Sequence, residues 1–196
     1  MSSARDQERR YLTIVSGWLV ALPHDLKVLF EAKDEPNLER SARELAAGAI
    51  IYILSPDTSG VDDFVAFADD AILLREALRA VSQGGGEGAS AFKERFSDLY
   101  ATLDDDLKLC RTVMGDAYEW LEQKISGLPK LVYKGKKIAQ YIDDDEHSEI
   151  LYEDGLAFTT DFPIDEEKLA MRLKKPETLL DPLRKRAAEE KRRRVG

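Results

Sequence analysis

Hydrophobic residues recur every three or four positions along most of this chain, which is the spacing of amphipathic helices. Near its beginning, Leu12, Val15 and Leu19 predict a helix over residues 5–22. Pro23 is expected to end that helix, because proline lacks an amide hydrogen and clashes with the preceding turn.

Two more helices are expected before the middle of the chain. A short one is predicted over residues 24–32, where apolar side chains continue at helical spacing. Asp34 is expected to cap the next helix, with Pro36 in the first turn, where proline is tolerated. That helix should run to about Leu54.

Residues 45–78 predict a helical hairpin, which we expect to be the most deeply buried part of the protein. Its first ten residues carry no charge, and Pro56 is expected to end the first helix near Leu54. Asp62 or Asp63 can then cap the second helix. The second helix is expected to bury one face, made of Phe64, Ala68, Ala71, Ile72, Arg75 and Leu78.

The composition changes at residues 83–90, which read QGGGEGAS and are typical of a flexible linker. Beyond this linker, apolar residues return at helical spacing and predict one long amphipathic helix, or a helix pair, over residues 91–128. The acidic run at residues 104–106 is expected either on the wet face of this helix or at a break within it.

The segment 129–182 predicts a small α+β module. Residues 131–142 are expected to form a β-hairpin, with a short helix as the alternative. Residues 149–160 give a stronger hairpin prediction, because Asp154-Gly155 favours a tight turn.

Two helices are expected near the end of the chain. Asp165 is expected to cap one, and Asp181-Pro182 to begin a final charged helix. The predicted fold class is therefore mainly α: a helical domain at residues 1–82, a long helix, a small C-terminal β-hairpin module, and a basic tail at residues 183–196.

Within the hairpin, a short motif begins with Tyr52-Ile-Leu-Ser-Pro and continues to Asp63-Phe-Val and the pair Asp69-Asp70. This motif resembles that of the YkvA-like domain, a bacterial domain of unknown function. The resemblance covers residues 45–78 and implies a YkvA-like helical domain, but it implies no reaction, because the family has no established activity. The residues that carry the motif are Ser55, Pro56, Gly60, Asp63, Asp69 and Asp70.

Charge is unevenly distributed along the chain. The 196 residues include 29 Lys and Arg against 38 Asp and Glu, a net charge of −9. Residues 183–196 hold seven basic and two acidic residues, so the chain before them holds 22 basic and 36 acidic residues, or −14. Because nucleic acid is bound largely through cations, such an acidic body is not expected to bind it.

The number of cysteines and the length of the apolar runs indicate the cellular compartment in which the protein is expected. Cys110 is the single cysteine, which fits a reducing cytoplasm. The start of the chain does not resemble a signal peptide, and the uncharged runs fall short of the ~20 residues that span a bilayer. We expect a cytoplasmic protein, with peripheral attachment to a membrane as the alternative.

The hairpin aspartates are the candidate metal ligands, because Mg²⁺ or Ca²⁺ requires several oxygens that converge on one point. Asp69 and Asp70 alone would make a poor chelate, since neighbouring residues of a helix point about 100° apart. The prediction favoured over metal binding is structural: one of the two bonds to the loop or to the end of the first helix while the other faces water. The full candidate set is Asp57, Asp62, Asp63, Asp69 and Asp70.

Other catalytic or metal-binding arrangements have little support. Residues 143–148 partly imitate a calcium loop with Asp154 at its twelfth position, but the glycine and glutamate of that motif are missing. A solvated acidic turn is expected instead. Cys110 lies in an apolar register, and the two histidines, His24 and His147, have no evident reason to meet.

The sequence therefore favours a non-enzymatic interaction or scaffold protein that has a protein partner and no cofactor. A cation-binding protein or enzyme that uses the hairpin aspartates is the first alternative. Peripheral binding of an anionic membrane through the tail is the second. The oligomeric state stays open. The tail residues that would make the membrane contacts are Arg184, Lys185, Arg186, Lys191, Arg192, Arg193 and Arg194.

Overall fold

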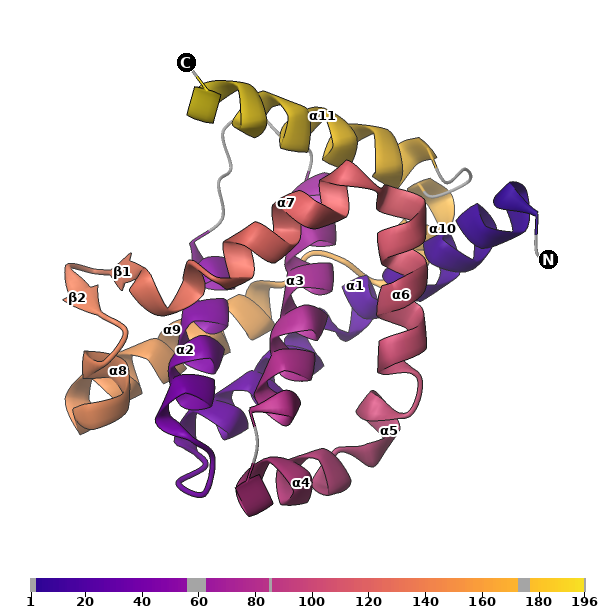
Figure 1. The fold of residues 1–196 in the computed structure, drawn as a ribbon. Helices are drawn as coiled ribbons and strands as arrows, with labels where there is room; N and C mark the ends of the chain where they lie inside the picture. Colours follow the sequence, from indigo (N-terminus) through magenta and orange to yellow (C-terminus); the bar gives the residue numbers. More distant parts are fainter. Residues whose placement is uncertain (1–2, 56–62, 85, 173–176, 196) are drawn as a thin grey trace.

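Three long helices form the centre of the fold, and each packs against the other two (Figure 1). They are α1 (Ala4–Asp34), α2 (Arg40–Leu54) and α3 (Asp63–Gln83). This arrangement is seen in a computed structural model, which describes residues 3–55, 63–84, 86–172 and 177–195.

Shorter elements surround this centre. Among the described residues the only strands are two of two residues each, which pair antiparallel as Val132↔Lys137 and Tyr133↔Lys136. The predicted class, mainly α with a small C-terminal β-hairpin, is confirmed. The remaining elements are α4 (Gly86–Arg95), α5 (Ser97–Tyr100), α6 (Leu103–Met114), α7 (Asp116–Ile125), the 3₁₀ turn η1 (Leu128–Lys130), β1 (Val132–Tyr133), β2 (Lys136–Lys137), α8 (Gln140–Asp143), α9 (Asp145–Asp161), α10 (Glu166–Arg172) and α11 (Glu177–Val195).

Helix α1 passes through Pro23, so the predicted break there is wrong. A stripe of buried residues, including Leu19, Leu22, Leu26 and Leu29, crosses the proline without interruption. Burying such side chains contributes roughly 1.5–3 kcal/mol each, enough in sum to exceed the ~3 kcal/mol that an interior proline costs. By length and composition α1 could cross a membrane, but it packs here in the protein core.

The residues predicted to begin the next helix lie elsewhere. Asp34 is the last residue of α1 and pairs with Lys33 instead of capping a helix. Pro36 precedes α2, which begins at Arg40. The end of α2 at Leu54, as predicted from Pro56, is confirmed.

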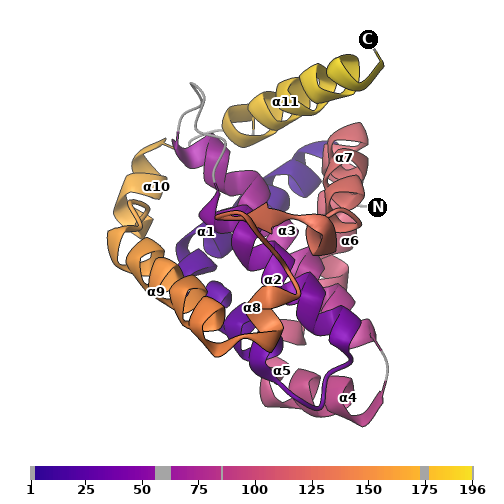
Figure 2. The same cartoon turned by 90° about the vertical axis from the view of Figure 1, so that its left-hand side faces the viewer.

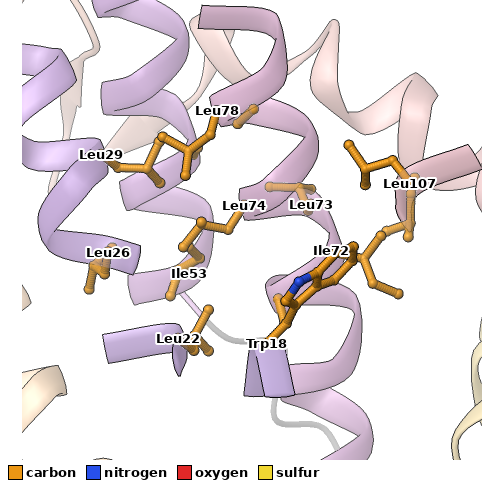
Figure 3. Close-up of a cluster of buried hydrophobic side chains, with 14 of the residues drawn as sticks. Trp18, Leu22, Leu26, Leu29, Ile53, Ile72, Leu73, Leu74, Leu78 and Leu107 are labelled. Atoms are coloured by element: carbon orange, nitrogen blue, oxygen red, sulfur yellow. The ribbon is translucent and has the colours of Figure 1, made fainter. Parts of the chain in front are cut away.

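Helix α3 is the most deeply buried element. Every residue from Ala68 to Leu78 is buried, so the prediction of a single buried face was too narrow. Figure 3 shows Ile72, Leu73 and Leu74 of α3 among side chains from the neighbouring helices, including Trp18. A helix buried on all sides is normally apolar all round, yet α3 carries four charged residues within this stretch.

Small residues in α2 allow another element to approach it closely. A Cβ atom on Gly48 would lie 2.4 Å from the carbonyl oxygen of Leu128, so only glycine fits against η1. Ala46, Ala47 and Ala49 are fully buried beside it.

The chain after α3 departs from prediction. Helix α4 begins at Gly86, inside the stretch 83–90 predicted as a linker. The predicted helix over 91–128 is divided among α4, α5, α6 and α7, and α6 turns into α7 at Gly115, whose φ is 58°. The acidic run at residues 104–106 forms the first turn of α6, where carboxylates favour the helix dipole.

The second predicted hairpin, at residues 149–160, is wrong, because this segment lies within helix α9. Asp144 caps α9 by accepting from the amide of His147 at 3.0 Å. A Cβ on Gly155 would lie 2.5 Å from the Phe30 ring, so this glycine serves a close helix–helix contact rather than a turn. Tertiary packing outweighs the local preference of Asp-Gly for turns.

The first hairpin and the last helices agree in part with prediction. Strands β1 and β2 lie within 131–142, and the short helix α8 follows them. Helix α10 begins directly after Asp165, as expected. Helix α11 contains Pro182 in its interior and begins five residues before it, so Asp181-Pro182 is not its start.

Candidate functional site

The pair Asp69-Asp70 lies inside the protein, on the face of α3 that meets α2, α7 and α11. Asp69 is 0 % exposed and accepts hydrogen bonds from the Tyr52 hydroxyl at 3.1 Å and the Arg186 guanidinium at 3.0 Å. Asp70 is buried as well. The expectation that one of the two faces water is therefore wrong.

A closed set of polar contacts surrounds Asp69. The Lys124 ammonium donates to the Tyr52 hydroxyl at 2.6 Å and lies 3.5 Å from the Glu190 carboxylate. The Trp120 indole N–H donates to Glu190 at 2.8 Å. Arg186 and Glu190 lie one turn apart on α11. The set of contacts therefore attaches α11 to α3 through Arg186 and to α7 through Glu190.

The Trp120 ring lies close to both cations of the cluster. The Lys124 ammonium is 4.1 Å from its centroid, and the Arg186 guanidinium carbon is 5.7 Å away. Cations over an indole face are attracted by the ring quadrupole. The aromatic ring therefore keeps the two positive groups beside Asp69.

Burial shapes the protonation of the cluster. It raises the pKa of Asp70 well above its usual range, and repulsion from Asp69 raises it further. Burial also raises the pKa of Asp69, while Arg186 and Lys124 oppose that rise. Burial lowers the pKa of Lys124. Asp70 Oδ2 is buried without a hydrogen-bond partner, which fits a carboxyl group that retains its proton.

The arrangement suits a structural tie better than a reaction centre. Asp69 is already paired with a guanidinium and a phenol, and its side chain is 0 % exposed. Among the described residues, no three His, Cys, Asp or Glu side chains converge as a metal site would require. Asp57 and Asp62 lie outside the described residues, and so does the side chain of Asp63, so the five-residue metal set stays a prediction.

Some residues of the YkvA-like motif are described by the structure and others are not. Ser55 is exposed at the end of α2, and Asp63 begins α3. Pro56 and Gly60 lie outside the described residues. Asp69 and Asp70 are buried, and Asp69 accepts from Tyr52, the first residue of the motif.

Two more buried charged groups on α3 are paired inside the protein. The Arg75 guanidinium donates to Asp25 and lies 5.5 Å from the Trp18 ring centroid. Glu76 accepts from the Tyr118 hydroxyl and from Arg79. Burial raises the pKa of Glu76. Helix α3 thus makes polar contacts with α1, α7 and α11.

The other candidate catalytic and metal residues are dispersed. Cys110 is buried, and burial raises the pKa of its thiol, which makes the thiolate scarce. His24 lies beside Asp25, whereas His147 lies beside Asp144 at the start of α9.

The acidic run 143–148 is structural in several of its members. Asp143 accepts two hydrogen bonds from Arg40, at 2.8 and 2.6 Å, and these bonds lower the pKa of the carboxyl group. The Ser148 hydroxyl accepts from the buried Lys33 at 2.7 Å. Asp154, the proposed twelfth ligand, accepts from Tyr133 and Lys134 instead.

The basic tail is a helix packed on the protein, and two of its cations make contacts with other elements. Arg184 donates to the Val113 carbonyl at 2.8 Å, and Arg186 binds Asp69. Lys185, Lys191 and Arg192 are exposed, as is Arg193. The Arg194 side chain lies outside the described residues. Membrane binding by the exposed cations stays a prediction.

The bond from Tyr52, in the last turn of α2, agrees with the prediction that one of the two carboxylates bonds to the end of the first helix. The sequence does not predict the contact with Arg186 or the presence of Lys124 in the cluster. The sequence does contain a signal: Leu179, Leu183 and Ala187 repeat at helical spacing in and just before the tail, and all three are buried. An apolar stripe on a charged helix indicates that the helix packs against something.

An open groove of about 350 Å³ lies between α1 and α9. Leu26 and Phe30 of α1 form its floor together with Gly155. Tyr152 and Leu156 of α9 stand beside it, 57 % and 56 % exposed. Figure 2 shows α9 on the outside of the molecule, away from α11.

A second groove of about 740 Å³ lies where α11 faces the junction of α6 and α7. Its lining includes Met114 and Trp120, and Asp116 and Glu119 of α7 stand opposite Arg184 of α11. Its two sides thus carry opposite charges.

Comparisons of the chain with protein-family models, with curated proteins and with solved structures found no match.

Proposed function

We propose that this protein is a non-enzymatic interaction or scaffold protein, built on a YkvA-like helical hairpin, that binds a protein partner through the exposed face of α9. The observation that carries the proposal is the pair Tyr152 and Leu156. Each exposes more than half of a large apolar side chain, and together they flank the α1–α9 groove.

Adjacent exposed apolar side chains beside a groove are typical of recognition surfaces. Tyr152 packs edge-on against Phe30, with ring centroids 5.7 Å apart, so its ring is held in place on the surface. A fixed aromatic ring presents a large contact area and loses little entropy on binding, which is why tyrosine is common in binding hot spots.

The charged groups in the interior favour this function over catalysis. Asp69, Arg75 and Glu76 each have a partner within the protein. Groups paired in this way stabilise one arrangement of helices and leave the surface to make the contacts that define the function.

The test compares the wild-type protein with Tyr152→Ser/Leu156→Ser. Val132→Ser is the control, because Val132 is 60 % exposed on β1 and lies outside the groove. Each protein is cross-linked in the cells that naturally contain it, and the recovered partner is rebound in purified form. We expect the wild type and the control to bind the purified partner and the double variant to lose about tenfold or more in affinity. Equal binding by all three proteins, or recovery of no partner, would contradict the proposal.

A further inference from the structure

We propose that the partner segment that fits the α1–α9 groove is a basic amphipathic helix: apolar residues one turn apart, with lysine or arginine close beside them. This inference rests on the proposed function and adds the chemistry of the partner. It is drawn from the apolar groove together with the charges around it.

The apolar part of the site matches one face of a helix. Tyr152 and Leu156 are four residues apart on α9, so their side chains lie one above the other, about 6 Å apart along the helix axis. With Leu26 and Phe30 of α1 they border a shallow groove rather than a deep pocket. Grooves of this kind between two helices accept the apolar face of a third helix.

The charged part of the site is acidic. Asp145 and Glu149 lie within about 60° of Tyr152 and Leu156 around α9, and all four are exposed. Among the described residues no cation lies within ion-pair distance of Asp145 or Glu149. Glu153, one residue beyond Tyr152, is exposed and equally unpaired within the described part of the chain.

The opposite side of the groove adds little positive charge. Glu31 and Asp34 of α1 line the groove there, Asp34 paired with Lys33 and Glu31 only 3.9 Å from Arg95. Lys27 is the exposed cation of the lining. A segment with lysines or arginines would therefore find unpaired carboxylates, whereas an anionic segment or membrane would be repelled.

The probe is a capped 18-residue peptide of leucine and lysine with leucines at helical spacing. A second peptide carries glutamate in place of each lysine, and a third has the first peptide's composition in an order without an apolar face. Binding is measured by fluorescence anisotropy at low and at physiological salt. We expect the lysine peptide to bind at least about tenfold tighter than either control peptide. The preference for it over the glutamate peptide should weaken as salt rises.

A matched pair of variants distinguishes binding of the lysine peptide at the α1–α9 groove from its non-specific attraction to an acidic protein. Asp145→Asn/Glu149→Gln removes two charges beside the α1–α9 groove. Asp116→Asn/Glu119→Gln removes two charges from the first and fourth residues of α7, away from this groove. We expect the first variant to lose several-fold affinity for the lysine peptide and the second to bind as the wild type does. Equal losses, or equal binding of lysine and glutamate peptides, would overturn the inference.

Two outcomes distinguish this inference from the function on which it rests. If Tyr152→Ser/Leu156→Ser abolishes binding of a purified partner while the peptides show no preference for lysine, the surface binds and the partner chemistry is wrong. If light scattering shows a dimer that this variant dissociates, the occupant is a second copy of the chain and the inference fails. If neither partner nor peptide depends on α9, both proposals fail.

Discussion

A carboxyl group buried without a hydrogen-bond partner destabilises a protein unless it stays protonated. Asp70 is in this situation, since its Oδ2 atom has no partner among the described residues and Asp69 lies next to it. Its pKa is raised by burial and then by repulsion from Asp69. The position is therefore one where the wild-type residue is not the most stabilising choice.

The pH dependence follows from the direction of this shift. An acid with a raised pKa in the folded protein binds more protons folded than unfolded. Its contribution to stability is therefore greatest below the unfolded pKa of about 4 and declines as the pH rises toward the folded value. Asp70→Asn removes the titration while keeping the side-chain shape. At pH 8 we expect its free energy of unfolding to exceed that of the wild type by on the order of 1 kcal/mol.

Urea unfolding at a series of pH values checks this prediction. The difference between Asp70→Asn and the wild type should shrink as the pH falls toward 4, where Asp70 of the unfolded chain also holds its proton. The opposite result would be a variant whose stability, compared with that of the wild type, falls as the pH rises from 5 to 8. That result would show that the ionised carboxylate stabilises the fold.

At the scale of elements, a buried ion pair helps to hold α11 on the protein. Arg186 is 16 % exposed and its partner Asp69 is fully buried. Arg186→Met would leave Asp69 buried without its cation, and breaking a buried pair in this way costs about 3–5 kcal/mol. Arg192→Met on the exposed side of α11 should change stability by less than about 0.5 kcal/mol. Urea unfolding of both variants checks this, and equal losses would show that the ion pair does not hold α11.

Two glycines in helices provide a second comparison. Gly48→Ala places a Cβ against the backbone of Leu128, where nothing can yield cheaply, so we expect a loss of about 1–3 kcal/mol. Gly17→Ala in α1 meets no atom within 4 Å and should gain up to about 1 kcal/mol from helix propensity. Thermal melts distinguish the two, and a stabilised Gly48→Ala would mean that η1 can move away from α2.

The elements that could be predicted are those where local sequence and tertiary packing agree. Helix α2 ends at Leu54, where the effect of Pro56 on the residue before it predicts an end. Pro23 gave a wrong prediction because buried residues on both sides of it outweighed the local signal. The Asp154-Gly155 pair gave one because Gly155 packs closely against the Phe30 ring. The bond from the end of α2 to Asp69 could be predicted, but the rest of the cluster could not, since residues 124 and 186 are distant in sequence and only folding brings them to α3.

At the scale of the molecule, polar contacts cross the stretch once predicted as a linker. The Tyr100 hydroxyl donates to the Leu78 carbonyl at 2.9 Å, Tyr118 binds Glu76 and Arg186 binds Asp69. One hydrophobic cluster contains buried residues from both sides of residues 83–90. The two halves of the chain therefore share the interior that stabilises each of them.

We accordingly expect a single cooperative thermal transition, with calorimetric and van't Hoff enthalpies that agree. The fragment 1–82 by itself should lack a fixed tertiary structure, because it would expose the apolar faces of α3 and leave Asp69 and Glu76 without their partners from α11 and α7. Calorimetry of the full chain and near-ultraviolet circular dichroism of the fragment check the two expectations. Two separate transitions, or a fragment with native-like aromatic signals, would show that the helical hairpin and its neighbours form a domain that folds without the rest.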